Sequence, residues 1–355
     1  MKITEIYTAK SVAAQFVTAA SNAIEYLGAG LFPAKKKLGL DLKQIRANKG
    51  LPVSLAPSNF DAKSTLRSRE GFKMEETEMA FFRESMLVKE RDEQDIMRVQ
   101  ESNDPYAMEI VSRVYDDANV LIEGANVVPE RMRMQLLAPQ NEGHPGITIA
   151  WDGVQYTYNY DPDGSYAANN YTELQGTAAW SNADSSNPLE DISAAIDAVE
   201  ELTGTKPAYI LMNKKTAGYL RKNAKIREAI LAQNTTANVL ITDGKVAEVL
   251  QNLLGVTPII YNKKFKDESG VAAQFYPDDF VTLIPEGELG STWYGTTPEE
   301  RTLSGNSEAD VAIVNTGVTV TVTVTSDPVN TKTTVSEIVL PSYERMSETY
   351  VIKVA

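Results

Sequence analysis

The sequence has no cysteine and a single histidine, His144, among its 355 residues. Without cysteine the chain can form no disulfide, thiolate metal site or cysteine nucleophile, and one histidine argues against a zinc site or a histidine-based catalytic triad. No run approaches about 18 apolar residues, so no segment is expected to span a membrane. The first residues lack the apolar stretch of a signal peptide, so the protein is expected to stay in the cytosol where it is made.

Basic residues are scarcer than acidic ones, which gives a formal net charge of −14, and they are unevenly distributed. Residues 1–49 carry a net charge of +5, which leaves −19 for the remainder. An acidic body repels nucleic acid, whereas a short basic segment can touch an acidic partner surface or a polyanion. The basic cluster Lys35, Lys36 and Lys37 is therefore a candidate contact site, and a merely solvated surface cluster is the alternative interpretation.

The longest helical pattern covers residues 104–137. Its apolar residues recur at steps of three and four, which places them on one helical face: Val111, Val114, Ala118, Leu121, Ala125, Val128, Met132 and Leu136. Asp104 followed by Pro105 is typical of a helix start. Pro129 removes one backbone hydrogen bond, so we predict a single bent helix of roughly 50 Å. Two core helices joined at residues 124–126 are the alternative.

Residues 49–100 are densely charged and lack a wide apolar face. Between residues 61 and 101 there are eight Lys or Arg and eleven Asp or Glu residues. A segment of this length without its own core is usually functional or disordered, so we interpret it as a loop that packs on another chain, with a flexible surface loop as the alternative. Its charged residues would steer association and its apolar residues would become buried. The candidate contact residues are Arg67, Arg69, Phe72, Met74, Phe81 and Phe82.

Turn signals and alternating residues divide the rest of the chain. Asp152-Gly153 between two alternating runs predicts a two-residue hairpin. The run 161–164, Asp-Pro-Asp-Gly, predicts a turn; it also resembles part of a calcium loop, but the further ligands and the glutamate at the twelfth position are missing. Helices and strands alternate over 187–310, which indicates an α/β domain with a mixed sheet. Val and Thr alternate over 318–328, which predicts a strand with one apolar and one solvent-exposed face.

The order of these segments resembles the major capsid proteins of tailed phages, and more narrowly the lambda-type protein E family. The resemblance covers nearly the whole chain, and its strength lies in the order and spacing of several short matches. These are Asp104-Pro105-Tyr106, Gly176-Thr177, Trp180-Ser181, Asn187-Pro188-Leu189-Glu190-Asp191-Ile192, Tyr276-Pro277-Asp278-Asp279, Gly290, Tyr294-Gly295, Thr325-Ser326-Asp327-Pro328 and Tyr350-Val351-Ile352-Lys353-Val354.

The resemblance implies an α+β fold of the Hong Kong 97 capsid type. Its parts would be an N-terminal arm over 1–45, an extended E-loop over 46–100 and a peripheral domain with a long spine helix over 101–186. An axial α/β domain would follow over 187–310, and strands over 311–355 would return to the peripheral domain. In this fold the E-loop lies over a neighbouring subunit, which agrees with the interpretation of residues 49–100.

The function implied by the resemblance is structural. The chain would self-assemble as hexamers and pentamers into an icosahedral virion shell that encloses double-stranded DNA without binding it specifically. Portal and scaffolding proteins, and a decoration protein as a further candidate, would be its partners, and assembly would take place in the host cytoplasm. Because the arm starts within the first residues, scaffolding is expected to be a separate protein. No catalytic residue, cofactor or metal is implied.

Two other functions are open from the sequence. A nanocompartment shell of the same fold would enclose an enzyme instead of DNA. A hydrolase could use Asp278, Asp279, Glu286 and Glu288 as acid and base, because paired carboxylates near a strand end can do such work. Acidic turns are far commoner than acidic active sites, however, and no nucleophile, histidine or metal set accompanies these residues, so the hydrolase is the less favoured of the two.

Overall fold

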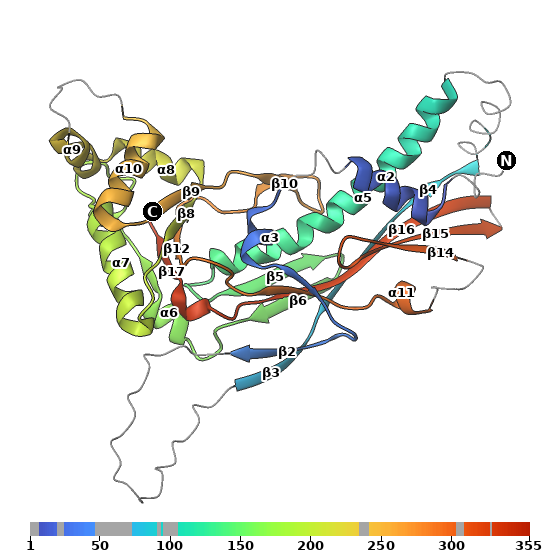
Figure 1. Cartoon of the computed structure of the whole chain (residues 1–355), viewed down its shortest axis with the longest axis horizontal. Helices are drawn as coiled ribbons and strands as arrows, with labels where there is room; N and C mark the ends of the chain where they lie inside the picture. The colour runs from blue at the N-terminus through green and yellow to red at the C-terminus, as the bar shows by residue number, and fades with distance from the viewer. Residues whose placement is uncertain are drawn as a thin grey trace, which may run out of the picture. The chain divides into compact units, whose positions relative to one another are not determined.

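The computed structural model describes residues 7–19, 25–46, 73–90, 94, 106–233, 241–302, 309–326 and 329–355. The chain divides into two compact units (Figure 1). Unit 1 comprises Met1–Lys43, Glu76–Met132 and Ser291–Ser342, and unit 2 comprises Gln44–Glu75, Arg133–Gly290 and Tyr343–Ala355. Each unit therefore combines segments that lie far apart in the sequence.

Unit 1 is built on a six-stranded sheet. The strands of this sheet are β1 (Ala34–Lys36), β4 (Ala80–Val88), β13 (Ser291–Tyr294), β14 (Ala309–Val314), β15 (Val318–Ser326) and β16 (Val329–Ser342). Its helices are α2 (Ala9–Ala19), α3 (Leu27–Leu31), α11 (Pro298–Thr302) and most of α5 (Tyr106–Leu137). Val339 of β16 pairs with Tyr294 of β13 and with Ala80 of β4. These two strands therefore lie on opposite edges of β16. Strand β15 pairs with the first half of β16, on the same edge as β13, and β14 pairs with β15.

Three valines of β15 belong to the core of unit 1. Val318, Val320 and Val322 are buried in one cluster with residues of α2 and α5, as the alternating pattern predicts. The threonine face differs from the prediction, because Thr319 and Thr321 are buried as well. The Thr297 hydroxyl, just before α11, donates to the Thr319 hydroxyl at 2.9 Å. The prediction of a solvent-exposed threonine face is therefore wrong at these two positions, since the α11 region packs on β15.

Helix α5 runs without interruption through Gly124 and Pro129. Its 32 residues correspond to roughly 48 Å. The prediction of one long helix is confirmed, and the alternative of two helices joined at residues 124–126 is wrong. Asp104 and Pro105, the predicted start, lie outside the described residues, and the bend at Pro129 stays a prediction.

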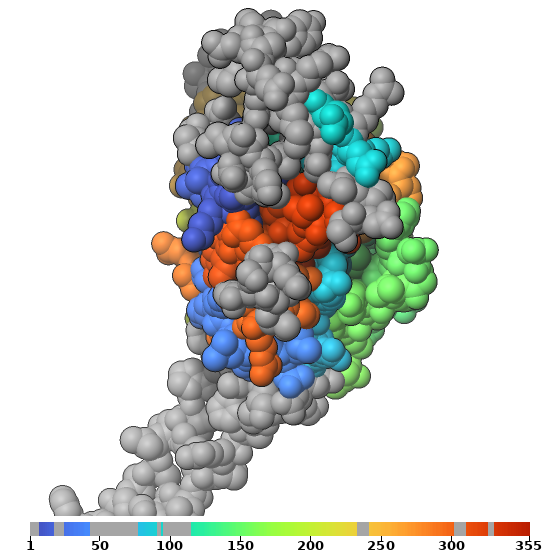
Figure 2. All heavy atoms as spheres, turned by 90° about the vertical axis from the view of Figure 1, so that its right-hand side faces the viewer, coloured from blue at the N-terminus to red at the C-terminus, as the bar shows by residue number. Residues whose placement is uncertain are grey.

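The N-terminal segment takes part in the unit 1 sheet. Strand β1 pairs in parallel with β13, with Lys35 opposite Trp293. The Thr292 hydroxyl donates to the carbonyl of the fully buried Phe32 at 2.8 Å. On α5, the buried Glu130 carboxylate accepts from the Gly28 N–H at 3.1 Å and holds α3. Figure 2 shows the N-terminal segment in blue beside the orange and red residues of the late strands.

Unit 2 contains a second sheet surrounded by helices (Figure 1). The sheet has the order β7 (Tyr171–Glu173), β17 (Tyr350–Lys353), β12 (Phe280–Ile284), β8 (Tyr209–Met212), β9 (Thr257–Ile260). The helices are α6 (Ser165–Asn169), α7 (Pro188–Thr203), α8 (Lys214–Lys222), α9 (Ala224–Gln233) and α10 (Asp243–Leu254), with 3-10 turns at Gly176–Ala178 and Met346–Glu348. The β17–β7 and β8–β9 pairs are parallel and the others antiparallel, so the predicted mixed sheet is confirmed.

The strand β17 lies in the unit 2 sheet, whereas β14, β15 and β16 lie in the unit 1 sheet. All five residues of β12 are buried, so this strand is central and needs a partner on each edge. Strand β8 occupies one edge and β17 the other, with Ile352 opposite Val281. The last strand also pairs with β7, which belongs to residues 101–186, and its place in a peripheral domain stays a prediction.

Three two-stranded sheets complete the architecture. They are β2 (Asp41–Arg46) with β3 (Lys73–Glu78), β5 (Gly146–Trp151) with β6 (Val154–Asn159), and β10 (Lys264–Lys266) with β11 (Ala272–Gln274). The predicted β5–β6 hairpin is confirmed. Asp152 and Gly153 have φ angles of 47° and 80°, as a turn that follows the right-handed strand twist requires.

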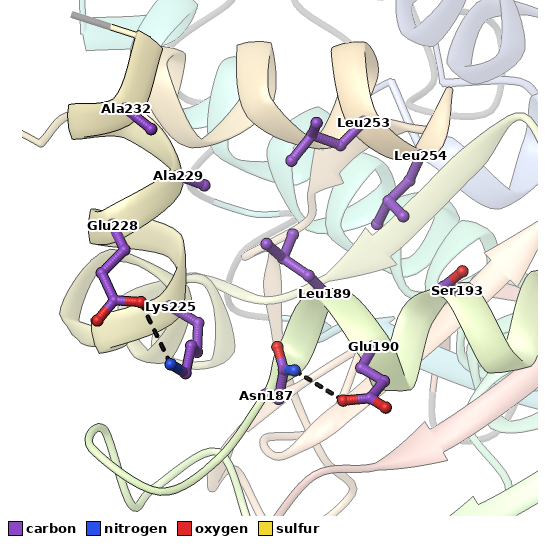
Figure 3. Close-up of a pocket in the computed structure, with 10 residues that line it drawn as sticks. All are labelled: Asn187, Leu189, Glu190, Ser193, Lys225, Glu228, Ala229, Ala232, Leu253 and Leu254. Atoms are coloured by element: carbon purple, nitrogen blue, oxygen red, sulfur yellow. Dashed lines mark hydrogen bonds and ion pairs between the residues drawn. The ribbon is translucent and has the colours of Figure 1, made fainter.

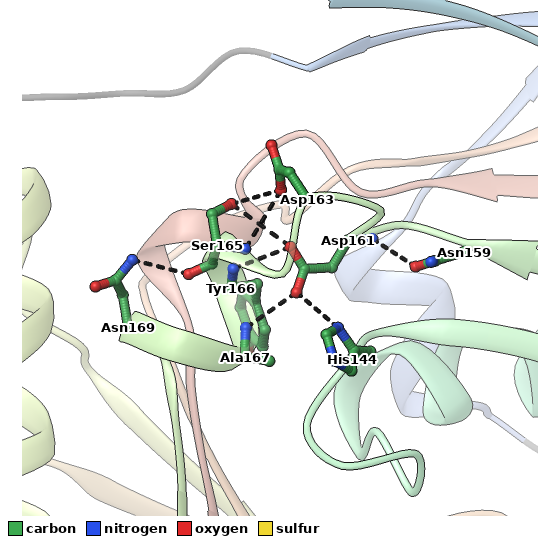
Figure 4. A network of polar contacts seen from close by, with 8 residues as sticks. All are labelled: His144, Asn159, Asp161, Asp163, Ser165, Tyr166, Ala167 and Asn169. Atoms are coloured by element: carbon green, nitrogen blue, oxygen red, sulfur yellow. Dashed lines mark hydrogen bonds and ion pairs between the residues drawn. The ribbon is translucent and has the colours of Figure 1, made fainter.

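The turn at residues 161–164 fixes the start of α6 (Figure 4). The Asp161 carboxylate is fully buried and accepts from the N–H groups of Tyr166 and Ala167, each at 3.0 Å. The Nδ1 atom of His144 lies 3.1 Å from the same carboxylate. The prediction of a turn is confirmed, and Asp161 uses both of its oxygens to hold backbone and histidine.

Candidate assembly surfaces

The predicted basic cluster lies on and just after β1, at an edge of the unit 1 sheet. Lys35 and Lys36 are exposed and Lys37 is half-buried. The Lys35 ammonium lies 5.6 Å from the centre of the Trp293 indole, and Lys36 forms a 2.6 Å ion pair with Glu300. Lys37 donates to a backbone carbonyl of β2 at 2.7 Å. The three lysines thus remain at the surface, but each already contacts its own chain.

The predicted E-loop residues are only partly described. Arg67, Arg69 and Phe72 lie outside the described residues, as does the side chain of Met74, whose backbone belongs to β3. Phe81 and Phe82 are half-buried on β4, opposite Ile338 and Glu337 of β16.

Strand β4 has a packing partner within its own chain. All nine of its residues pair with β16, and Ala80 and the preceding Met79 are buried. Strand β4 therefore packs within its own chain, which the interpretation of residues 49–100 did not include, and its contact with another chain stays a prediction. The sequence did not predict this strand, because only its two end residues are buried and charged residues lie between them.

A chain of contacts links β4 to α11 and β16. The Arg83 guanidinium lies 4.8 Å from the centre of the Phe81 ring and forms a 2.6 Å ion pair with Glu299. The Ser336 hydroxyl donates to the same carboxylate at 3.0 Å. Because about half of the Arg83 side chain is exposed, solvent screens this pair, and it fixes the position of β4 more than it stabilises the fold.

The unit 1 sheet offers free edges for association. Within the described part of the chain, β1, β4 and β14 each have a single strand neighbour. Edge strands can pair with a strand of another chain through their unused backbone groups. Apolar side chains accompany two of these edges, since Leu38 after β1 is 85% exposed and Leu87 on β4 is 53% exposed. These strand edges are the surfaces of unit 1 most suited to subunit contact.

The carboxylates of the hydrolase alternative do not form one site. Asp279, with a φ of 66°, accepts from the Lys215 ammonium at 2.8 Å and from the Tyr219 hydroxyl at 2.9 Å, and the Asn213 amide donates to Asp278. The hydrogen bond to Asp279 raises the pKa of Lys215 above its ordinary value. These two aspartates are engaged in holding α8.

Glu286 and Glu288, the other members of the hydrolase set, contact a different residue. Their backbone carbonyls accept from the guanidinium of Arg345 at 2.8 and 3.1 Å. The structure therefore brings Asp278 and Asp279 together in an ion-paired cluster and gives Glu286 and Glu288 a separate structural role.

A groove in unit 2 lies between α7, α9 and α10 (Figure 3). Its volume is about 650 Å³, and Leu189, Leu253 and Leu254 line it together with two alanines. The polar residues at its rim bond to one another: Asn187 to Glu190 at 2.8 Å and Lys225 to Glu228 at 3.2 Å. The arrangement offers apolar packing surface together with the hydroxyl of Ser193.

Sequence reasoning did not identify β1 and β14 as edge strands of the sheet. The exposed leucines after β1 were a usable signal, because Leu38 and Leu40 follow a lysine run and face solvent. The edge of β14 left no such signal, since its pattern of apolar residues is the same for an edge strand and a central strand.

Solved structures share this fold over nearly their whole length. A phage-related protein from Bordetella bronchiseptica RB50 is 14% identical, with a TM-score of 0.55, and the match covers 96% of this chain and 97% of that chain. A structure described as a prophage capsid protein of Escherichia coli CFT073 is 14% identical, with a TM-score of 0.61 and coverage of 98% and 99%. The capsid of cyanophage A-1(L) is 12% identical, with a TM-score of 0.50 and coverage of 92% and 91%. The fold is therefore α+β of the Hong Kong 97 type.

The sequence itself shows the family. No curated protein matches the chain significantly. The family described as phage major capsid protein E matches residues 10–354, which include the described elements of both units. The chain therefore belongs to the phage major capsid protein E family and is a structural subunit of a phage capsid.

Proposed function

We propose that the chain assembles with copies of itself into hexamers and pentamers, and that these close into an icosahedral shell around the double-stranded DNA of a tailed phage. The observation that carries the proposal is the family match over residues 10–354. The free strand edges of unit 1 support it, because many modest, symmetry-repeated contacts can hold a shell without one tight site.

The partners and the place of assembly belong to the same proposal. Assembly takes place in the host cytoplasm with a portal and a separate scaffolding protein, and with a decoration protein as a further candidate. The shell has no catalytic role and needs no cofactor. The net charge of −14 supports enclosure of DNA without specific binding, because an acidic wall repels the phosphate backbone.

Electron microscopy of the expressed protein tests the proposal. The protein is purified alone and then together with the products of its neighbouring genes. Closed shells or flat hexamer arrays are expected, and shells formed in infected cells should contain DNA. Shells filled with an enzyme would favour the nanocompartment instead. A strictly monomeric protein in both preparations would contradict a shell of any kind.

The apolar residues of β4 are proposed to contact a neighbouring subunit. Replacing Phe81 and Phe82 by serine should leave a folded subunit and lower the yield of shells at least about tenfold, because half-buried aromatic residues at an interface carry much of its energy. Sedimentation and electron microscopy measure the yield, and circular dichroism checks the fold. Val271→Ser, at an exposed position of unit 2, is the control. A normal yield from the double variant would refute this assignment of β4.

The basic cluster is proposed to engage a scaffolding protein or an acidic loop of a neighbouring subunit. Replacing Lys35, Lys36 and Lys37 by glutamine should impair assembly severalfold and make the remaining assembly less sensitive to salt. The loss of the Lys36–Glu300 pair should have little effect on stability, because such surface pairs contribute about 0 to 1 kcal/mol. Glutamine at three other exposed lysines, Lys206, Lys264 and Lys266, gives the same charge change and serves as the control. An unchanged shell yield would contradict the proposed role of the basic cluster in assembly.

A further inference from the structure

A basic groove lies on the outer face of α8 in unit 2. This surface cavity of about 580 Å³, here called the α8 groove, is lined by Lys214, Lys215, Gly218, Arg221 and Lys222 among others. Every charged side chain that lines it is basic, although the chain as a whole carries a net charge of −14. Gly218 lies one turn from the residues on either side, and its missing side chain leaves room between them.

The positive charge of the α8 groove is only partly balanced within the chain. Lys215 pairs with Asp279 at 2.8 Å and Arg221 with Asp243 at 3.2 Å. Lys214 and Lys222 form no ion pair with any described residue. Lys214 and Lys215 also occupy the first turn of α8, which has no acidic residue, so the positive end of the helix dipole adds to their repulsion.

The C-terminal half of α7 shows the opposite charge. Asp197, Glu200 and Glu201, here called the α7 acidic end, are exposed and spaced by three and four residues, which places them on one side of the helix. None of the three forms an ion pair with a described residue. The last turn of α7 has no basic residue, so the negative end of the helix dipole opposes these charges too.

The two surfaces lie at opposite ends of β8. Helix α7 ends at Thr203, the strand follows as Tyr209–Met212, and α8 begins directly after Asn213. The strand β8, four residues long, connects the two helices along the chain. Figure 1 shows α7 and α8 at different places beside the unit 2 sheet. One copy therefore presents both surfaces to its surroundings.

We propose that the α8 groove of one subunit receives the α7 acidic end of a second copy. The contact would pair the unbalanced positive charge of the α8 groove with the unbalanced negative charge of the α7 acidic end. It uses different surfaces on the two partners. Such a head-to-tail contact generates a ring when its rotation closes. The proposal rests on the proposed shell function and names the surfaces that join subunits around one capsomer.

Charge reversal at each surface tests the proposal. Lys214→Glu with Lys222→Glu, and separately Glu200→Lys with Glu201→Lys, should each lower ring and shell formation at least tenfold at low salt. A chain that carries all four substitutions should regain assembly, because its two surfaces are complementary again. Lys264→Glu with Lys266→Glu changes the net charge as the first pair does, at exposed positions of β10, and should assemble normally.

Thermal unfolding separates assembly from folding. The α7 reversal should not lower the melting temperature of the isolated subunit, because lysines near the C-terminus of α7 agree with its helix dipole. In the α8 reversal, glutamate at position 214 agrees with the dipole of α8 and glutamate at position 222 opposes it, so the melting temperature should change little. If wild type forms shells and both reversal variants do so equally well, the proposed contact is wrong and the shell function stands. If the variant with all four substitutions assembles as poorly as the two single-surface variants, the proposed contact is also wrong. A wild-type protein that forms no assembly overturns both the contact and the shell function.

Discussion

Replacing Asp161 by alanine should lower the free energy of unfolding by about 3 kcal/mol, because it leaves two backbone N–H groups of α6 without their acceptor. The carboxylate is fully buried and accepts from Tyr166 and Ala167 at 3.0 Å each, with His144 at 3.1 Å (Figure 4). Denaturant-induced unfolding of the subunit, followed by circular dichroism, measures the loss. The effect should be among the largest of any single polar substitution in unit 2.

Two matched variants identify the cause of that loss. Asp161→Asn keeps an acceptor oxygen without the charge and should lose about half as much stability. Asp163→Ala removes a neighbouring, exposed carboxylate that accepts from the N–H and hydroxyl of Ser165, and it should cost below about 1 kcal/mol. Equal losses for Asp161→Ala and Asp163→Ala would mean that the buried carboxylate does not organise the start of α6.

Trp180→Ala should be at least as destabilising, with a loss of about 3 to 5 kcal/mol. The side chain is 1% exposed and belongs to the core cluster of unit 2 with Ile192, Val199 and Val256. Its indole N–H donates to Asp191 at 2.9 Å. The alanine variant leaves a cavity and removes this donor, whereas Trp180→Phe fills most of the space and should lose less than half as much.

The phenylalanine variant also carries a pH signature. Burial raises the pKa of Asp191, and the hydrogen bond from Trp180 lowers it in part. Without that bond the pKa should rise further. A carboxyl whose folded pKa is raised binds its proton more tightly in the folded state, so stability falls as the pH rises through the unfolded and then the folded pKa. This fall should be steeper for Trp180→Phe than for wild type, and an NMR titration of Asp191 that shows no change would contradict the role of the indole.

Features encoded by neighbouring residues could be read from the sequence. The apolar spacing along α5 specified one continuous helix, and Asp152-Gly153 specified the β5–β6 turn. Gly204 ends α7 with a φ of 69°, where a residue with a side chain would be strained. In each case the physical cause lies within a few residues of its effect.

Features that depend on distant partners could not be read in this way. Nothing near Lys35 indicates that its strand pairs with Trp293. The burial of Thr319 depends on Thr297 and α11, and the placement of β17 depends on β12. Periodicity identifies a strand and its two faces, but it does not identify the neighbour that covers each face.

The candidate contact residues follow the same distinction. The sequence placed Lys35 to Lys37 at the surface, where the structure has them, but it could not reveal their contacts with Trp293 and Glu300. It also located Asp278 and Asp279 in one turn, without the cation of Lys215 that engages them. Composition alone made β4 look unstructured, because its partner β16 lies about 250 residues later.

The positions of β16 and β17 determine how late during protein synthesis the two sheets can be completed. Strand β16 lies between β4 on one edge and β13 and β15 on the other, and β17 lies between β7 and β12. Each sheet therefore requires a strand from residues 329–353. A nascent chain on the ribosome can complete neither unit before these residues emerge. Truncated translation products are thus unable to form either finished sheet.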